Sequence, residues 1–96
     1  MAAIEQSVSA ESRAEIEQRI KRLLVTQLTV DPAVLASSDS TTPLLGHGIG
    51  LDSIEVMVLA LAIENEFNLQ IPDQDLTAAL FKDLGTLTDY ISSKRA

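Results

Sequence analysis

Residue Ser53 lies in the segment 50–54 (Gly-Leu-Asp-Ser-Ile), where a glycine-rich loop meets an apolar stretch. Three of the chain's four glycines precede it: Gly46, Gly48 and Gly50. Glycine allows the backbone a positive φ and a sharp bend. A helix is expected to begin at Asp52-Ser53, with Glu55 completing a capping box. The serine hydroxyl then stands exposed at a helix N-terminus, whose unpaired N–H groups suit a phosphate. The pattern predicts an attachment point for a phosphorylated group.

Two other roles for this serine are open from the residues alone. A catalytic nucleophile needs a nearby base, and the only histidine of the chain is His47, six residues earlier. No strand precedes the serine, so the segment is not the nucleophile elbow of a hydrolase. The serine could also do no more than start a helix in an unmodified acidic adaptor. We therefore name no catalytic residue.

A longer set of residues resembles the acyl carrier proteins. Leu51-Asp52-Ser53-Ile54 is followed by a helix ending Glu64-Asn65-Glu66-Phe67 and then by Ile71-Pro72-Asp73. The resemblance runs from about Ala10 to Ser93, and we expect a carrier domain over 10–96 after a flexible tail over 1–9. It implies that a phosphopantetheinyl transferase, using Mg²⁺, attaches 4′-phosphopantetheine from coenzyme A to Ser53. Acyl groups then ride on this arm as thioesters, and the carrier itself catalyses nothing.

The chain also departs from housekeeping fatty-acid carriers. Val58 stands where those carriers place a mid-helix glutamate, and the approach to the serine is longer. We therefore expect a free-standing carrier in a specialised pathway of the fatty-acid or polyketide type. A peptidyl or aminoacyl carrier shares the same fold and serine and is the alternative. The implied partners are acyl-transferring, condensing or acyl-activating enzymes with basic or apolar docking surfaces.

Composition limits the other possibilities. The 96 residues fit one small domain, and the net charge of −7 argues against nucleic-acid binding. The absence of cysteine excludes disulfides and thiolate metal sites, and no EF-hand spacing is present, so we name no metal site. No apolar run is long enough for a membrane span and no signal peptide is visible, so we expect a cytoplasmic monomer. No Lys or Arg lies between Leu23 and Phe81, which favours basic partner surfaces, although acidity also serves solubility.

Helical periodicity and caps predict an all-α bundle of three main helices and one short one. The first begins at a capping box, Ser12-x-x-Glu15, and ends between Leu28 and Val30. A long loop follows, held to the bundle by its own apolar residues: Leu44, Leu45, Ile49 and Leu51. The second helix runs from about Asp52 to Phe67. A short helix follows Pro72, and Asp83 caps the last one.

The second helix carries two apolar stripes, and a small bundle needs to bury only one of them. Val56, Leu59, Ala60, Ile63 and Phe67 are expected to face the core. The other stripe is expected to be partly exposed and to dock partners together with the two acids beside the serine. The predicted partner-binding set is Asp52, Ile54, Glu55, Met57, Val58 and Leu61. The alternative is that both stripes are buried. A cavity for an acyl chain is a further hypothesis, with candidate lining residues Leu59, Ile63, Leu76, Leu80 and Leu84.

Overall fold

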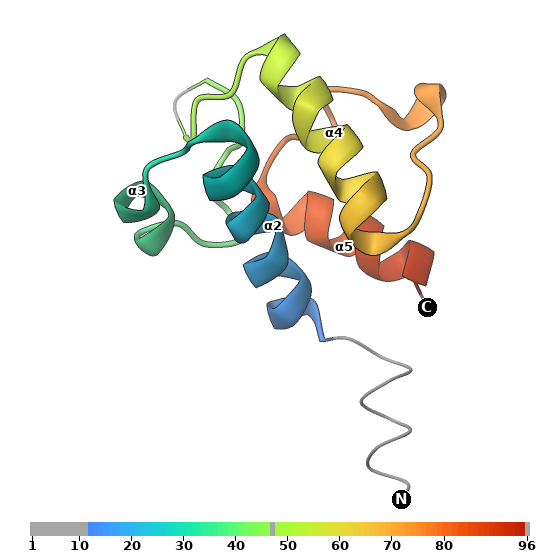
Figure 1. The fold of residues 1–96 in the computed structure, drawn as a ribbon, viewed down its shortest axis with the longest axis horizontal. Helices are drawn as coiled ribbons and strands as arrows, with labels where there is room; N and C mark the ends of the chain where they lie inside the picture. The colour runs from blue at the N-terminus through green and yellow to red at the C-terminus, as the bar shows by residue number, and fades with distance from the viewer. Residues whose placement is uncertain (1–11, 47, 96) are drawn as a thin grey trace, which may run out of the picture.

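The structure, a computed structural model, describes residues 12–46 and 48–95 and is helical. Its elements in chain order are α2 (Arg13–Leu28), α3 (Pro32–Ala36), α4 (Ser53–Phe67), the 3₁₀ turn η1 (Asp73–Asp75) and α5 (Leu84–Arg95). Helix α2 packs against both α4 and α5, and Figure 1 shows these three main helices gathered around one core. The described ranges contain two isolated β-bridges and no strand. The predicted all-α fold is confirmed; the predicted tail over 1–9 lies outside the described residues.

Helix α2 begins and ends where its sequence signals lie. The Ser12 side chain accepts a hydrogen bond from the Glu15 backbone N–H, and the Glu15 carboxylate accepts one from Ser12, which completes the predicted capping box. The helix ends at Thr29, which takes a left-handed conformation with φ of 53°. One apolar stripe is buried: Ile16, Ile20, Leu23 and Leu24.

The core is mostly aliphatic, with two buried phenylalanines, Phe67 and Phe81, and is shared by the three main helices. Helix α4 buries Leu59, Ala60, Ile63 and Phe67, and α5 buries Leu84, Leu87 and Ile91. Val56, the first residue of the predicted inner stripe of α4, is half-buried. Burial of apolar side chains supplies the main stabilisation of this bundle. Each Å² of apolar surface removed from water contributes about 25 cal/mol to the free energy of folding.

The long connection from α2 to α4 is held in place rather than free. It begins with the short helix α3, which Asp31 caps and Pro32 opens. Leu44 and Leu51 are buried while Leu45 and Ile49 are half-buried, as predicted. The connection also lies against the start of α5, where Leu84 N donates to Thr42 O at 3.2 Å and Gly85 N donates to Ser40 O at 2.8 Å. Backbone carbonyls of the loop thus satisfy two orphan N–H groups of α5.

The segment between α4 and α5 is fixed at both ends. Pro72 precedes η1, as predicted. The short helix predicted after it is a single 3₁₀ turn. The Tyr90 hydroxyl donates to the Asp75 carboxylate at 2.6 Å, which ties η1 to α5. Asp83 accepts a hydrogen bond from Thr86 N at 2.7 Å and caps α5 as predicted. This segment forms one wall beside the start of α4.

Candidate functional site

Ser53 is the first residue of α4 and its side chain is exposed. The Asp52 carboxylate accepts from Glu55 N at 2.8 Å, and the Glu55 carboxylate accepts from Asp52 N at 3.1 Å. The predicted capping box is therefore formed. Within the described part of the chain, the N–H groups of Ser53 and Ile54 have no hydrogen-bond partner. The hydroxyl stands beside two open donors at the positive end of the helix, where an anionic phosphodiester is stabilised.

The loop before Ser53 is shaped by glycines and closed by backbone hydrogen bonds. Gly46 and Gly50 take positive φ values of 63° and 86°, which a side chain would strain. Ile49 N donates to Pro43 O at 2.8 Å and Leu51 N donates to Leu44 O at 2.9 Å. Because Leu44 and Leu51 are themselves buried, the chain enters α4 from an anchored point. The serine is exposed but its backbone is held in place.

An apolar pocket of about 460 Å³ opens beside Ser53. It is lined by the loop, the start of α4 and the segment after η1: Leu45, Leu51, Ser53, Val56, Met57, Leu76, Thr77, Ala78 and Phe81. Only the two hydroxyl residues of this set have polar side chains. The pocket can therefore cover a hydrocarbon group but offers little to a charged or strongly polar one.

The hollow beside Ser53 is not the core cavity hypothesised from the sequence. Of the five candidates, only Leu76 lines this pocket. Leu59, Ile63 and Leu84 are fully buried and Leu80 is 8% exposed, because the inner face of α4 packs directly on its neighbouring helices. The hollow lies at the side of α4, beside the irregular segment that follows η1. Leu45, Thr77 and Ala78 were missed because they carry no periodic signal.

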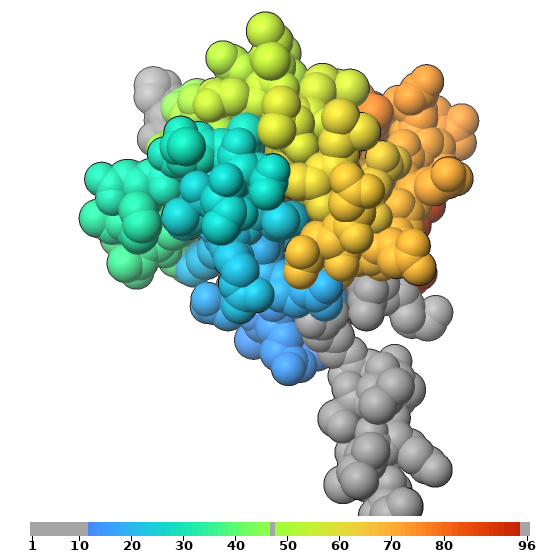
Figure 2. Space-filling model, viewed as in Figure 1, coloured from blue at the N-terminus to red at the C-terminus, as the bar shows by residue number. Residues whose placement is uncertain are grey.

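The second stripe of α4 is exposed, which confirms the predicted exposure and makes the alternative of two buried stripes wrong; its docking role stays a prediction. Ile54 is 74% exposed, Met57 49%, Val58 38% and Leu61 61%. Figure 2 shows α4, coloured yellow-green to yellow, open to the surface between α2 and the orange segment that follows α4. Met57 belongs both to this stripe and to the wall of the pocket, so the stripe and the pocket meet at Met57. Ser53, one helical turn earlier, also lines the pocket. Asp52 is also exposed and Glu55 is half-buried.

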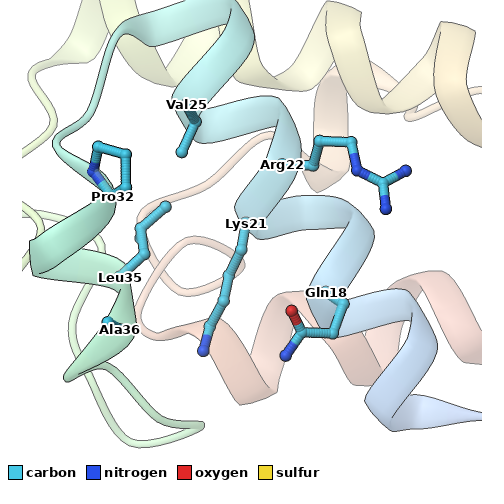
Figure 3. Close-up of a pocket in the computed structure, with 7 residues that line it drawn as sticks. All are labelled: Gln18, Lys21, Arg22, Val25, Pro32, Leu35 and Ala36. Carbon is cyan, nitrogen blue, oxygen red and sulfur yellow. The ribbon is translucent and has the colours of Figure 1, made fainter.

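A second hollow, of about 390 Å³, lies between α2 and α3 and shares no residue with the pocket at Ser53. Figure 3 shows its lining, with the Arg22 side chain directed away from α3. The Lys21 ammonium donates to Ser38 O at 3.1 Å, so this cation holds the loop. The residues that line this hollow include no nucleophile paired with a base and no group of metal ligands.

Other kinds of site find no support in the described ranges. Residues 12–46 and 48–95 contain no cluster of three or more His, Cys, Asp or Glu side chains placed to hold a metal ion. His47, the only histidine of the chain, lies outside the described residues. In the same ranges, no helix has the length and apolar composition to cross a membrane.

Comparison with known proteins agrees with the site. The family described as "Phosphopantetheine attachment site" matches residues 18–91, which include Ser53 and both walls of its pocket. An acyl carrier protein from Bdellovibrio bacteriovorus (strain HD100) is 33% identical over 79 residues, covering 82% of this chain and 94% of that protein. The cofactor of such a domain is 4′-phosphopantetheine. A helical bundle, an exposed serine at a capped helix start and these two matches lead to one conclusion: the chain belongs to the acyl carrier protein family.

Proposed function

We propose that Ser53 is the residue that receives 4′-phosphopantetheine, and that the chain carries acyl groups on this arm to partner enzymes. The observation that carries the proposal is the exposure of the Ser53 hydroxyl at the capped start of α4, beside an apolar pocket. No other serine in the described ranges combines a helix N1 position with such a pocket.

The residues of this chain present the hydroxyl and do not activate it. In the attachment reaction, Ser53 Oγ forms a bond to the phosphorus that bears pantetheine in coenzyme A, and adenosine 3′,5′-bisphosphate leaves. The transferase supplies the base that takes the hydroxyl proton, so this chain needs none. The open N–H groups of Ser53 and Ile54 lie next to the phosphodiester that results. When bound, the arm supplies a thiol to which acyl groups are joined as thioesters.

The walls of the pocket favour an apolar acyl group as cargo. Leucine, valine, methionine and phenylalanine side chains line most of it, and burial of a hydrocarbon there is favourable by about 0.8 kcal/mol per methylene. This supports a pathway of the fatty-acid or polyketide type over an aminoacyl or peptidyl one, because a charged amino group would lose hydration in the pocket. The apolar residue Val58 supports a specialised pathway.

Partner enzymes dock, in this proposal, over the exposed stripe of α4. Its residues are Ile54, Met57, Val58 and Leu61, with Asp52 and Glu55 at the edge nearest the serine. An exposed apolar stripe marks an interaction surface, and this one begins directly beside the hydroxyl that must be reached. The first such partner is the phosphopantetheinyl transferase.

Mass spectrometry of the intact protein tests the attachment. The unmodified chain is incubated with coenzyme A, Mg²⁺ and a broad-specificity phosphopantetheinyl transferase, and the expected product is heavier by one phosphopantetheine. Ser53→Ala is expected to stay unmodified. Ser37→Ala is the matched control, since Ser37 is also exposed, and it is expected to react like the wild type. A wild type that gains no mass refutes the proposal.

The choice of pathway needs a second assay. The modified protein is offered to a housekeeping malonyl transferase and, separately, to adenylating enzymes that load fatty acids or amino acids. We expect poor malonyl loading and better loading with a fatty acyl group. Efficient malonyl loading would contradict the specialised assignment, and efficient aminoacyl loading would favour the peptidyl alternative.

A further inference from the structure

One wall of the pocket beside Ser53 is a stretch of chain that forms only turns. Residues 76–79, called the wall segment below, follow η1, and Leu76, Thr77 and Ala78 of this segment line the pocket. Leu76 is half-buried and packs against the core, whereas residues 77–79 are exposed. Figure 1 shows this part of the chain in orange at the edge of the bundle. The wall segment therefore has the pocket on one side and solvent on the other.

The backbone of the wall segment makes local hydrogen bonds. Leu76 N donates to Asp73 O at 3.1 Å, and Thr77 N donates to Asp75 O at 2.9 Å. Leu80 N in turn donates to Thr77 O at 3.1 Å. In the part of the chain that the structure describes, no backbone hydrogen bond joins residues 76–79 to α2, α4 or α5. Because a single helical turn is marginally stable in water, the wall segment depends on the contacts at its two ends.

The two ends of this stretch are held in different ways. At the end nearer α5, Leu80 is buried in the core. At the end nearer α4, Ile71 N donates to the Glu64 carboxylate at 2.8 Å, and four residues later Asp75 accepts from the Tyr90 hydroxyl at 2.6 Å. Over the described ranges, this bond from Tyr90 is the one hydrogen bond or ion pair that joins residues 72–79 to a main helix.

The hydrogen bond between Tyr90 and Asp75 has the features of a strong contact. A length of 2.6 Å is typical of a hydroxyl that donates to a carboxylate, and such bonds contribute more to stability than neutral ones. Burial, together with this hydrogen bond, raises the pKa of Tyr90 to about 12, so the hydroxyl keeps its proton at neutral pH. The Lys94 ammonium lies 5.4 Å from the centre of the tyrosine ring and covers it. The donor is thus held in place on α5.

We propose that the hydrogen bond from Tyr90 to Asp75 is a latch on the wall of the pocket. While it is formed, the wall segment lies against the pocket; when it breaks, residues 72–79 detach and the pocket opens, with α2, α4 and α5 still packed. Tyr90 is then a positioning residue that acts on the pocket through Asp75. A pocket with a releasable wall admits an apolar group larger than its closed volume of about 460 Å³. The latch is a property of the fold and operates whether or not Ser53 is modified.

Amide hydrogen exchange of the full chain at pH 7, followed residue by residue by NMR, tests the latch. Tyr90→Phe keeps the ring and removes only the donor. Exchange of the amides of Leu76, Thr77 and Leu80 is expected to become about tenfold faster, which corresponds to about 1.4 kcal/mol. Amides in the middle of α2 and α4 should stay within twofold of the wild type, because the bundle itself does not open.

A double-substitution cycle shows whether the contact itself is responsible. Asp75→Ala should accelerate the same amides about tenfold, and the variant with both substitutions should exchange no faster than either single one. Asp89→Ala is the matched control, since it removes the exposed ion pair of α5 with Arg13 and should leave the wall segment within twofold.

Three results would overturn the latch. The first is unchanged exchange of the wall segment in both single variants. The second is an equal acceleration in α2 and α4, which would mean that the whole fold is loosened. The third is a double variant whose acceleration is the product of the two single effects, since Tyr90 and Asp75 would then act independently.

Discussion

Gly48→Ala is the substitution that most directly tests how the loop holds Ser53 in place. A β-carbon built on Gly48 would overlap the carbonyl group of Pro43, 2.6 Å from its carbon, and would lie 2.9 Å from the Pro43 β-carbon. The obstacle is backbone, so the loop itself must move. The same carbonyl accepts the hydrogen bond from Ile49 N. The substitution therefore breaks the closure of the loop.

The expected cost follows from the contacts that are lost. The hydrogen bonds Ile49 N–Pro43 O and Leu51 N–Leu44 O contribute about 1 kcal/mol each. Partial exposure of the fully buried Leu44 adds about 1 kcal/mol. Alanine lowers the conformational entropy of the unfolded chain, which offsets less than about 1 kcal/mol of this loss in stability. Gly48→Ala should thus lower the free energy of unfolding by about 2–3 kcal/mol, a shift in Tm of roughly 10–20 °C.

Urea denaturation followed by circular dichroism measures this change. The control is Gly46→Ala, because a β-carbon at Gly46 would meet no atom within 4 Å apart from those of Gly46 and its two chain neighbours, and only its φ of 63° is unfavourable. That strain costs about 1 kcal/mol, so Gly46→Ala should be the milder variant. A Gly48→Ala protein within 0.5 kcal/mol of the wild type, or one more stable than Gly46→Ala, would refute the explanation.

Two further substitutions test the segment that walls the pocket. Asp83→Ala removes the cap of α5 and should lower the free energy of unfolding by about 1 kcal/mol at pH 7, whereas Asp83→Asn should lower it less. The backbone hydrogen bond from Thr86 lowers the pKa of Asp83, so the difference between wild type and Asp83→Ala should shrink as pH falls below 4. Burial, with the hydrogen bond to Asp75, raises the pKa of Tyr90 to about 12 from 10.0. The stabilising effect of the protonated Tyr90 hydroxyl is therefore present below pH 10 and lost as pH rises towards 12. The free energies of unfolding of wild type and Tyr90→Phe, measured by denaturation, should converge over that interval.

Local rules predicted the elements that depend on neighbouring residues. The capping boxes at Ser12 and Asp52 need only residues three apart, and both form as expected. The two stripes of α4 follow from helical periodicity, which places one inside and one outside. The exposure of Ser53 followed from its position at a helix start. These features share one property, which is that their causes lie within a few turns of the chain.

Features that depend on distant residues were not predictable in this way. The pocket joins Leu45 to Phe81 across the fold, and no pattern in the sequence pairs them. Glu17 and Lys21 have the spacing of a helix surface pair, but the structure directs them to the loop, at Ser40 Oγ and Ser38 O. Contacts between a helix and a distant loop compete with pairing along the helix. The spacing of residues in the sequence does not show which distant groups come near a side chain.

The docking of the loop on the start of α5 has a consequence for synthesis. Ser40 and Thr42 accept hydrogen bonds from residues more than forty positions later, so these two contacts of the loop cannot form until the start of α5 has left the ribosome. A nascent chain that ends before α5 therefore lacks the two hydrogen bonds that hold the early part of the loop against that helix. The complete set of contacts that holds the connection before Ser53 is therefore formed only when the last helix is present.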